Sequence, residues 1–288
     1  MGKILDGILV SKKIKKKIKL EINNLKIKPH LGIILIGENK ESLIYVNNKI
    51  KDCKEVGIKT SLIKLSKNIG EEELLKIVNS LNLSNHINGY ILQLPIPKYI
   101  NEQKIIMAIN PKKDVDGFHP ENFGKMALEI NTFLPATACA ILYIFKYYKI
   151  ATKGKKCLVI GRSNIVGKPI SILMGNKNNP GNATVTVIHS NSLDIEFYTK
   201  NADIIIIAIG VPNFLKSSMI KKNSIIIDVG INQVKNNFYK KGYFFVGDAD
   251  FDEIKAKTSY ITPVPGGVGP VTRAMLLKNT LLAYKKNN

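Results

Sequence analysis

The sequence predicts an α/β protein of two domains, in which helices cover parallel sheets. The chain has 288 residues, and a single hydrophobic core stops growing near this size, so two domains are expected. Short runs rich in Ile and Val alternate with helical patterns, as they do when helices connect parallel strands. One of these strands leads through a glycine-containing turn into a helix, which is typical of a dinucleotide-binding sheet.

Six apolar runs predict buried parallel strands, because each is short, rich in β-branched residues and closed by glycine or polar residues. They are 31–37, 88–95, 155–161, 183–189, 202–210 and 223–230. Helical patterns fill the windows 41–55, 71–81 and 167–176 between them. The segment 176–183 has the composition of a surface loop.

Three further helices are expected outside these strands. Residues 11–20 are basic, but Ile14 and Ile18 are one helical turn apart, so a solvated helix with one buried stripe is predicted. A long apolar helix, at about 137–149, follows Thr137 as its N-cap and leads into the second half. The last helical pattern, 272–285, lies beyond the final strand of that half and can return to the first domain.

The formal net charge is +21. An excess of this size suits an anionic small molecule, a nucleic acid or a membrane, or it is a bias of composition without function. The charge is mostly lysine and is scattered, with no nucleic-acid-binding motif, so neither nucleic acid nor membrane is expected as a partner. The three cysteines are far apart and form no metal-ligand spacing, so no metal is expected. Isolated cysteines and an N-terminus unlike a signal peptide favour a cytoplasmic protein.

The segment 155–169 reads as strand, tight turn and helix. Gly161 ends the strand, Gly167 opens the helix, and Ser163 stands where the dinucleotide fingerprint usually has its second glycine. Free N–H groups at the start of such a helix can receive a pyrophosphate.

The end of the following strand bears on the choice of cofactor. An NAD enzyme commonly has an acid there for the ribose hydroxyls, whereas this strand ends in His189 and Ser190. Arg162 and a hydroxyl can bind a 2′-phosphate by charge-assisted hydrogen bonds, so NADP is favoured. The alternative is that Arg162 only pairs with a surface acid.

Ser42, Tyr45 and Lys49 are spaced by three and four residues and share one face of the 41–55 helix. Apolar residues border this face, so burial can lower the pKa of Lys49 and suit it to proton transfer. A solvated helix face has the same pattern. Gln93 interrupts an apolar strand, where it can equally make a structural hydrogen bond. Asp116 lies in a turn and can form that turn or accept hydrogen bonds from an amino-pyrimidine edge.

Taken together, these segments resemble the bifunctional methylenetetrahydrofolate dehydrogenase/cyclohydrolase family along nearly the whole chain. The motifs that carry the resemblance stand in order. They are Tyr45-Val46-x-x-Lys49, Gln93-Leu94-Pro95-x-Pro97, Lys113-Asp114-Val115-Asp116-Gly117-Phe118, Gly161-Arg162-Ser163-x-Ile165-Val166-Gly167-Lys168-Pro169, Asp228-Val229-Gly230-Ile231-Asn232 and Thr262-Pro263-Val264-Pro265-Gly266-Gly267-Val268-Gly269-Pro270-x-Thr272.

The resemblance implies an N-terminal folate-binding catalytic domain, residues 1–140 with 266–288, and a Rossmann-type NADP-binding domain, residues 141–265. It implies NADP-dependent oxidation of 5,10-methylenetetrahydrofolate and hydrolysis of the methenyl product to 10-formyltetrahydrofolate, a step of one-carbon metabolism linked to purine biosynthesis. It also implies a homodimer. Polyglutamate tails of folates are anionic, so the lysine-rich surface could steer them.

The resemblance also assigns roles to residues. Lys49 would act on the attacking water, Gln93 would hold Lys49, Tyr45 would stack on the folate, Asp116 would anchor the pterin and Ser42 would support the site. Further cofactor contacts are implied for Gly161, Arg162, Ser163, Ile165, Val166, Gly167, His189, Ser190 and Ile231. Substrate contacts are implied for Tyr45, Asp116, Pro265, Gly266 and Gly267.

Some positions depart from the family pattern. Ala136, Ala138 and Ala140 replace its usual Cys, Pro and Gly, and Asn191 and Ser192 replace a basic residue and Thr after Ser190. Three alternatives stay open, the first because of these departures and the last because of the net charge of +21. They are a member with only one of the two activities, another two-domain NAD(P) dehydrogenase, and a basic nucleic-acid-binding protein.

Overall fold

The chain folds into two compact α/β units. In a computed structural model, which describes residues 2–235 and 242–287, one unit comprises Lys12–Ala136 with Arg273–Asn288 and the other Met1–Ser11 with Thr137–Thr272. We name them the three-strand unit and the six-strand unit after their parallel sheets. The predicted two-domain α/β fold is confirmed.

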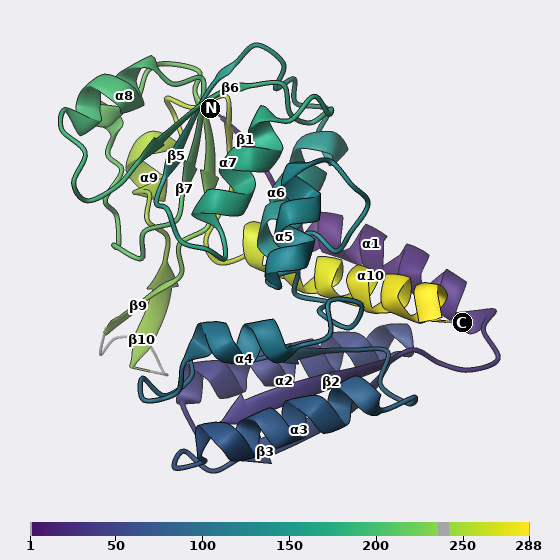
Figure 1. The fold of residues 1–288 in the computed structure, drawn as a ribbon. Helices are drawn as coiled ribbons and strands as arrows, with labels where there is room; N and C mark the ends of the chain where they lie inside the picture. The colour runs from purple at the N-terminus through teal and green to yellow at the C-terminus, as the bar shows by residue number, and fades with distance from the viewer. Residues whose placement is uncertain (1, 236–241, 288) are drawn as a thin grey trace. The chain divides into compact units, whose positions relative to one another are not determined.

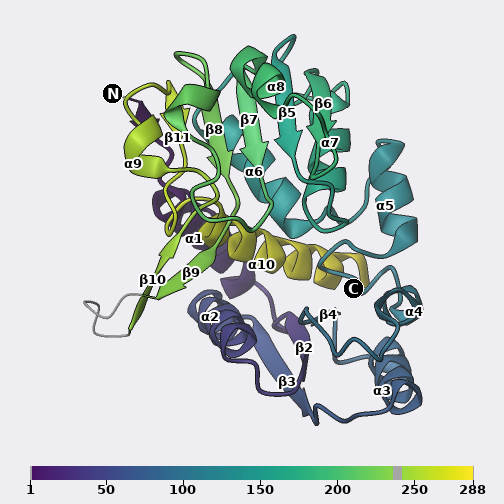
Figure 2. The ribbon, with the colours of Figure 1, turned by 90° about the vertical axis from the view of Figure 1, so that its left-hand side faces the viewer.

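The three-strand unit is a parallel sheet between helices. Its strands β2 (His30–Ile36), β3 (Lys59–Leu65) and β4 (Gly89–Leu92) run in the order β3-β2-β4. In Figure 2, α2 (Lys40–Val56) lies on one side of this sheet, and α3 (Glu71–Leu83) and α4 (Glu102–Ala108) lie on the other. A short helix, α5 (Pro120–Ala127), follows.

Side-chain alternation explains these two layers, since successive residues of a strand point to opposite faces. Ile34 and Ile36 of β2 belong to a buried cluster with Leu74 and Val78 of α3. Ile33, on the opposite face of β2, is fully buried as well. A central strand that is buried on both faces needs a continuous apolar sequence, which β2 has.

The six-strand unit holds one parallel sheet in the order β1-β11-β8-β7-β5-β6. The strands are β1 (Lys3–Ile4), β5 (Lys156–Ile160), β6 (Thr184–Ile188), β7 (Ile204–Ile207), β8 (Ile225–Asp228) and β11 (Tyr260–Ile261). The helical elements are α6 (Ala136–Tyr147), α7 (Gly167–Gly175), α8 (Ile195–Asn201), the 3₁₀ turn η1 (Ser217–Met219) and α9 (Phe251–Ile254). The strands β9 (Asn232–Lys235) and β10 (Tyr243–Val246) form an antiparallel pair, seen at the edge of this unit in Figure 1.

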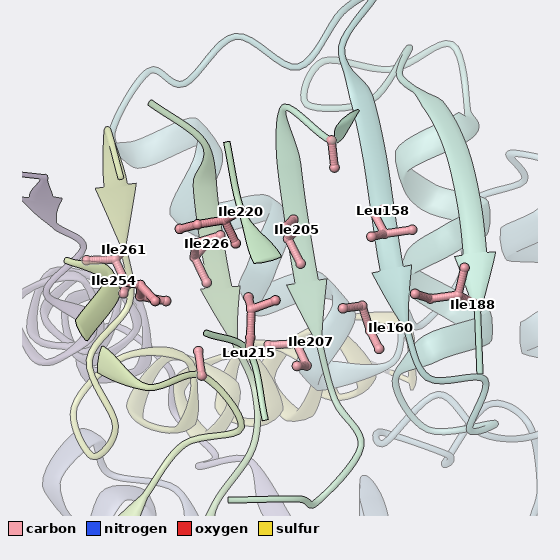
Figure 3. Packing of buried hydrophobic residues seen from close by; sticks show 12 residues of the cluster. Leu158, Ile160, Ile188, Ile205, Ile207, Leu215, Ile220, Ile226, Ile254 and Ile261 are labelled. Carbon is pink, nitrogen blue, oxygen red and sulfur yellow. The ribbon is translucent and has the colours of Figure 1, made fainter. Parts of the chain in front are cut away.

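The core of the six-strand unit is an array of aliphatic side chains on one face of its sheet (Figure 3). Leu158 and Ile160 of β5 lie beside Ile205 and Ile207 of β7, and Ile226 of β8 continues the array. These pairs stand at neighbouring register positions, so the sheet gains stability from burying one continuous apolar surface.

The last helix, α10 (Val268–Asn287), belongs mainly to the three-strand unit. The side-chain amide of Asn279 donates to the backbone oxygens of Val115 (2.9 Å) and Leu134 (3.1 Å). The prediction that the C-terminal helix returns to the first domain is thus confirmed. The basic segment forms α1 (Gly7–Asn23), in which Ile14 and Ile18 are buried as predicted.

Three local predictions were incomplete or wrong. β3 was not predicted, because it lies at a sheet edge and its sequence mixes lysines with apolar residues. The strand β6 was expected to be buried, but only Ile188 is, because β6 forms the other sheet's edge. Thr137 lies inside α6 rather than at its N-cap, since the helix already begins at Ala136, a good helix former.

Candidate active site

Helix α2 carries the three polar residues predicted to share one face. The Asn39 side chain caps the helix by accepting the Ser42 N–H at 3.0 Å, which fixes where the helix begins. Ser42 is buried, Tyr45 is 37% exposed and Lys49 is half-buried. These three side chains therefore lie along the edge of the core, as the sequence predicted.

Lys49 donates to the side-chain oxygen of Gln93 at 3.0 Å. Gln93 follows β4, and its backbone N–H bonds to the oxygen of Ile34 on β2 at 2.9 Å. Its side-chain amide nitrogen donates to the oxygen of Leu94 at 2.8 Å, which leaves the side-chain oxygen directed to Lys49. The structure thus brings together two residues that are 44 positions apart in the sequence.

Asp116 lies in a loop that Asp114 organises. The buried carboxylate of Asp114 accepts the N–H groups of Gly117 (3.0 Å) and His119 (2.8 Å) and the side-chain amide of Asn122 (2.9 Å). Gly117 has φ 77°, a conformation that favours glycine. Three bonds to one carboxylate hold this loop, so Asp116 has a defined place.

Asp116 also lines a small pocket whose walls are mostly apolar. Leu92, Leu94, Ile106 and Phe118 are among the other lining residues. Burial therefore raises the pKa of Asp116 to about 6, against the opposing effect of the positive charge of Lys49. The carboxyl group is thus mostly ionised at neutral pH but titrates close to it.

The pKa of Lys49 is lowered, chiefly because burial disfavours the ammonium form. Asp116 and Cys53 oppose this shift, and the positive charge of Arg273 adds to it. Lys49 and Asp116 thus influence one another directly, and Gln93 provides a neutral hydrogen-bond partner for the amine. A lysine with a lowered pKa and a fixed partner can accept a proton from water.

The glycine turn between β5 and α7 leaves no room for side chains at two positions. A Cβ on Gly161 would lie 2.5 Å from the oxygen of Ala208, and one on Gly167 would lie 2.2 Å from the oxygen of Gly161. Gly161 also has φ 116°. This close packing of turn and helix is what the dinucleotide fingerprint provides.

Ser163 accepts hydrogen bonds from backbone N–H groups at the start of α7. Its hydroxyl accepts the N–H groups of Val166 (3.2 Å) and Gly167 (3.3 Å), and its backbone oxygen accepts that of Lys168 (3.0 Å). The expectation of free N–H groups was therefore wrong for these three. The Ser163 hydroxyl, which a glycine lacks, occupies two of them, and the backbone oxygen of the turn occupies the third.

The other predicted cofactor residues follow the carboxyl ends of parallel strands. Register pairs Ile160 with Ile188, so Arg162 and Ser190 come just after neighbouring strand ends, and both are exposed. His189 is half-buried, and Ile165 and Ile231 are 40% and 42% exposed. Ligands of parallel sheets bind outside these strand ends.

Pro265, Gly266 and Gly267 form a turn before α10, in the six-strand unit. Gly266 has φ 111°, and its oxygen accepts the N–H of Gly7 at 2.9 Å. A Cβ on Gly267 would lie 2.5 Å from the oxygen of Pro263. The turn thus needs both glycines, whereas Lys49, Gln93 and Asp116 belong to the other unit.

Sequence reasoning missed two charged clusters. Asp52, one turn beyond Lys49, bonds to Arg273 and Lys15. In the six-strand unit the buried Asp228 accepts the N–H groups of Gly230, Asp248 and Ala249. Burial raises the pKa of Asp228 to about 7. The Asp228-Val229-Gly230 motif could have indicated the second cluster, since a buried acid at a strand end needs such donors.

In the described ranges 2–235 and 242–287, no helix is long and apolar enough to cross a membrane.

Comparison with known proteins places the chain in a family. The model of the tetrahydrofolate dehydrogenase/cyclohydrolase catalytic domain matches residues 5–116, and that of the NAD(P)-binding domain of the same family matches residues 135–288. The bifunctional protein FolD of Flavobacterium johnsoniae is 53% identical over 286 residues, which cover 98% of this chain and 97% of that relative.

Solved structures agree with this result. The bifunctional enzyme FolD of Campylobacter jejuni matches with a TM-score of 0.93 and 43% identity over 100% of both chains. The dehydrogenase-cyclohydrolase of Trypanosoma brucei, solved with NADP and an inhibitor, matches with a TM-score of 0.93 and 35% identity over 99% of this chain and 98% of that one. The chain therefore belongs to the tetrahydrofolate dehydrogenase/cyclohydrolase family.

Proposed function

We propose that this protein is a bifunctional folate enzyme. It oxidises 5,10-methylenetetrahydrofolate to 5,10-methenyltetrahydrofolate with NADP, and it hydrolyses the methenyl cation to 10-formyltetrahydrofolate. Family membership supports both reactions, because relatives with full-length similarity are named as bifunctional. The observation that carries the proposal for this chain is the bond between Lys49 and Gln93 at 3.0 Å.

Hydrolysis needs a base for water and an acid for the departing nitrogen. Neutral Lys49 takes a proton from water while the water oxygen bonds to the methenyl carbon. The carbon–N5 bond then breaks as the Lys49 ammonium gives its proton to N5, and the hydroxyl proton passes to solvent as the formyl group forms. The lowered pKa of Lys49 favours the neutral amine at the start of this sequence, and Gln93 keeps the amine in place.

The remaining residues of α2 and the Asp116 loop position the folate. Asp116 accepts hydrogen bonds from the amino-pyrimidine edge of the pterin, for which an ionised carboxylate is a strong partner. The ring of Tyr45 stacks on the folate, and its 37% exposure leaves a surface for this. Ser42, buried in the first turn of α2, supports the site.

The six-strand unit fits a dinucleotide, because the turn at Gly161 and Gly167 has the backbone packing that such a ligand requires. NADP supplies the hydride acceptor for the oxidation. Its 2′-phosphate is held by Arg162 and Ser190. The rest of the dinucleotide contacts Ser163, Ile165, Val166, His189 and Ile231. Pro265, Gly266 and Gly267 contact the folate. Residues 141–265 would thus form the NADP domain, and 1–140 with 266–288 the folate domain.

We further propose that the protein works in the cytoplasm as a homodimer. Two of its three cysteines, Cys53 and Cys157, are buried thiols whose pKa burial raises to about 12, and a reducing compartment suits such thiols. Light scattering at micromolar concentration should give twice the chain mass, and a monomer there would contradict the dimer.

The deciding experiment follows NADPH and the methenyl intermediate together, with methylenetetrahydrofolate and NADP as substrates. NADPH should form and 10-formyltetrahydrofolate should accumulate. Lys49→Met should leave oxidation measurable but abolish the enzymatic hydrolysis, so that the methenyl compound persists. Absence of NADPH formation with either NADP or NAD would contradict the dehydrogenase assignment.

Lys51→Met is the matched control. Lys51 lies on the same helix and is exposed, so the substitution removes one positive charge from α2 without touching Gln93. Both activities should stay within about twofold of the parent enzyme, since exposed charges contribute little. Equal losses in the two variants would show that the charge of the helix, and not Lys49, matters.

A further inference from the structure

The loop that follows β7 packs against the glycine turn that follows β5. The N–H of Ala208 bonds to the oxygen of Ile160 at 3.0 Å, and a Cβ on Gly161 would lie 2.5 Å from the oxygen of Ala208. The strands β6 and β7 flank β5 on its two sides (Figure 2), so the strand order reverses between β5 and β7. A dinucleotide binds across the carboxyl ends of the strands at such a point.

Asp248 fixes the loop after β7. It follows β10 and is fully buried. One oxygen of its carboxylate accepts the N–H groups of Ile209 at 2.7 Å and Gly210 at 3.0 Å. These two residues come directly after Ala208, so the carboxylate holds the stretch of backbone that packs on the glycine turn. Hydrogen bonds to an ionised acceptor are among the strong ones.

The second oxygen of the same carboxylate holds the segment after β8. It accepts the side-chain amide of Asn232, the first residue of β9, at 2.8 Å. The carboxylate carbon packs on the backbone of Gly230, where a Cβ would lie 2.2 Å from it. Ile231 stands between these two residues and is 42% exposed, so both of its neighbours contact Asp248. One carboxylate thus joins the segments that follow two adjacent strands.

Asp248 is itself held in place by Asp228, the last residue of β8. The Asp228 carboxylate accepts the backbone N–H of Asp248 at 3.0 Å and that of Ala249 at 2.8 Å. The backbone N–H of Leu215 bonds to the backbone oxygen of Asp248 at 3.0 Å. The backbone of Asp248 is therefore bound on both sides, which fixes the direction of its carboxylate.

We propose that Asp248 is a positioning residue for the nicotinamide half of NADP, because it holds the segments after β7 and β8 in one arrangement. The inference rests on the proposed function, which places the 2′-phosphate at Arg162 and Ser190, after β5 and β6. The dinucleotide then extends across β5, so its nicotinamide half lies at the ends of β7 and β8. Asp248 is fully buried and acts through the backbone of these segments, without contact to the cofactor.

The test compares the Kd of NADP with the Kd of adenosine 2′,5′-bisphosphate, the fragment that carries the 2′-phosphate, by calorimetry on the folded full chain. Asp248→Asn replaces one acceptor oxygen by an amide nitrogen, so at least one buried donor faces another donor. The Kd of NADP should rise about tenfold, as the loss of one buried hydrogen-bond partner predicts. The Kd of the fragment should stay within about twofold, because it binds at the ends of β5 and β6, away from the substitution.

A double variant provides the rescue. Asp248→Asn combined with Asn232→Asp exchanges the donor and the acceptor of the 2.8 Å bond and keeps the net charge of the parent. The side-chain nitrogen at position 248 can then donate to the carboxylate at position 232. The Kd of NADP should therefore return to within about threefold of the parent value.

Asn232→Ala decides the matter if Asp248→Asn does not fold. It removes one donor to Asp248 and leaves the bonds to Ile209 and Gly210 in place. The segment after β8 loses its link to Asp248. The Kd of NADP should rise in this variant, and the Kd of the bisphosphate fragment should stay unchanged.

Asp252→Asn is the matched control. Asp252 lies on α9 of the same unit, and its side chain is 87% exposed. The substitution removes the same charge as Asp248→Asn without touching the segments after β7 and β8. The Kd values of NADP and of the fragment should both stay within about twofold of the parent, since exposed charges contribute little.

The inference fails if Asp248→Asn and Asn232→Ala bind NADP as tightly as the parent does. It also fails if NADP and the bisphosphate fragment weaken equally, because Asp248 would then support the unit as a whole and not the nicotinamide half. Absence of NADP binding in the parent enzyme would instead overturn the proposed function, so the two failures are distinguishable.

Discussion

Asp116 has a pKa of about 6 in the folded protein, raised by burial. The carboxyl group is therefore ionised above pH 6 and increasingly protonated below it. Only the ionised form accepts two hydrogen bonds from the pterin edge. We expect the KM for methylenetetrahydrofolate to rise about tenfold between pH 7 and pH 5, as titration of one group at pH 6 dictates. Steady-state kinetics across this range measure it.

Asp116→Asn supplies the comparison for that prediction. The amide of this variant does not titrate. The variant's KM for methylenetetrahydrofolate should therefore be high at every pH and should not change near pH 6. Glu73→Gln, at an exposed position in the first turn of α3, should keep the step. A KM for the parent enzyme that is flat from pH 5 to pH 7 would contradict the anchoring role of Asp116.

The residues that the sequence predicted correctly as neighbours lie on one element or in one motif. Ser42, Tyr45 and Lys49 follow from helical periodicity alone. The pairing of Asp52 with Arg273 spans 221 positions, and no local pattern encodes a contact between two surface-type residues so far apart. Such a contact depends on where α10 packs, which is decided by the fold as a whole.

The loop around Asp114 depends on one carboxylate that accepts two backbone N–H groups and the Asn122 amide. Asp114→Ala leaves these buried donors without a partner, which costs about 2–4 kcal/mol of unfolding free energy. Urea denaturation measures this loss. Because the loop carries Asp116, the KM for folate should rise as well.

Glu73→Ala is the control for the loop variant, since it removes an exposed acid that holds no loop together. Its unfolding free energy should change by less than about 0.5 kcal/mol. If Asp114→Ala were as stable as this control, the loop would be held by other contacts, and the argument for a defined Asp116 would fail.

Among the elements, strands with a continuous apolar sequence were easier to predict than strands that mix polar and apolar residues. The sequence of β7 is uniformly aliphatic because both of its faces are buried. The edge strand β3 mixes lysines and other polar residues with apolar residues without a regular alternation, so its sequence suits a loop or a helix as well as a strand. The strand β6 was predicted, but its exposure to solvent was not. A β-branched sequence occurs in edge strands as well as in central strands, so it does not tell the two apart.

At the scale of the whole molecule, the formal charge of +21 has not yet been given a role. If the lysine-rich surface steers polyglutamylated folate, the kcat/KM for that substrate should fall several-fold between about 0.05 M and about 0.3 M salt, as the Debye length shortens. The monoglutamate substrate is the control and should respond less. Equal salt dependence for both substrates would mean that the charge does not serve capture.

Both units are completed by segments from the C-terminal part of the sequence. In the six-strand unit Lys3 and Ile4 pair with Tyr260 and Ile261, and in the three-strand unit Asn279 binds Val115. A ribosome releases the chain from its N-terminus onward. The six-strand sheet therefore cannot pair β1 with β11, and the three-strand unit cannot receive α10, until residues beyond 260 have emerged, so we expect nascent chains to need protection from aggregation almost to the end of synthesis.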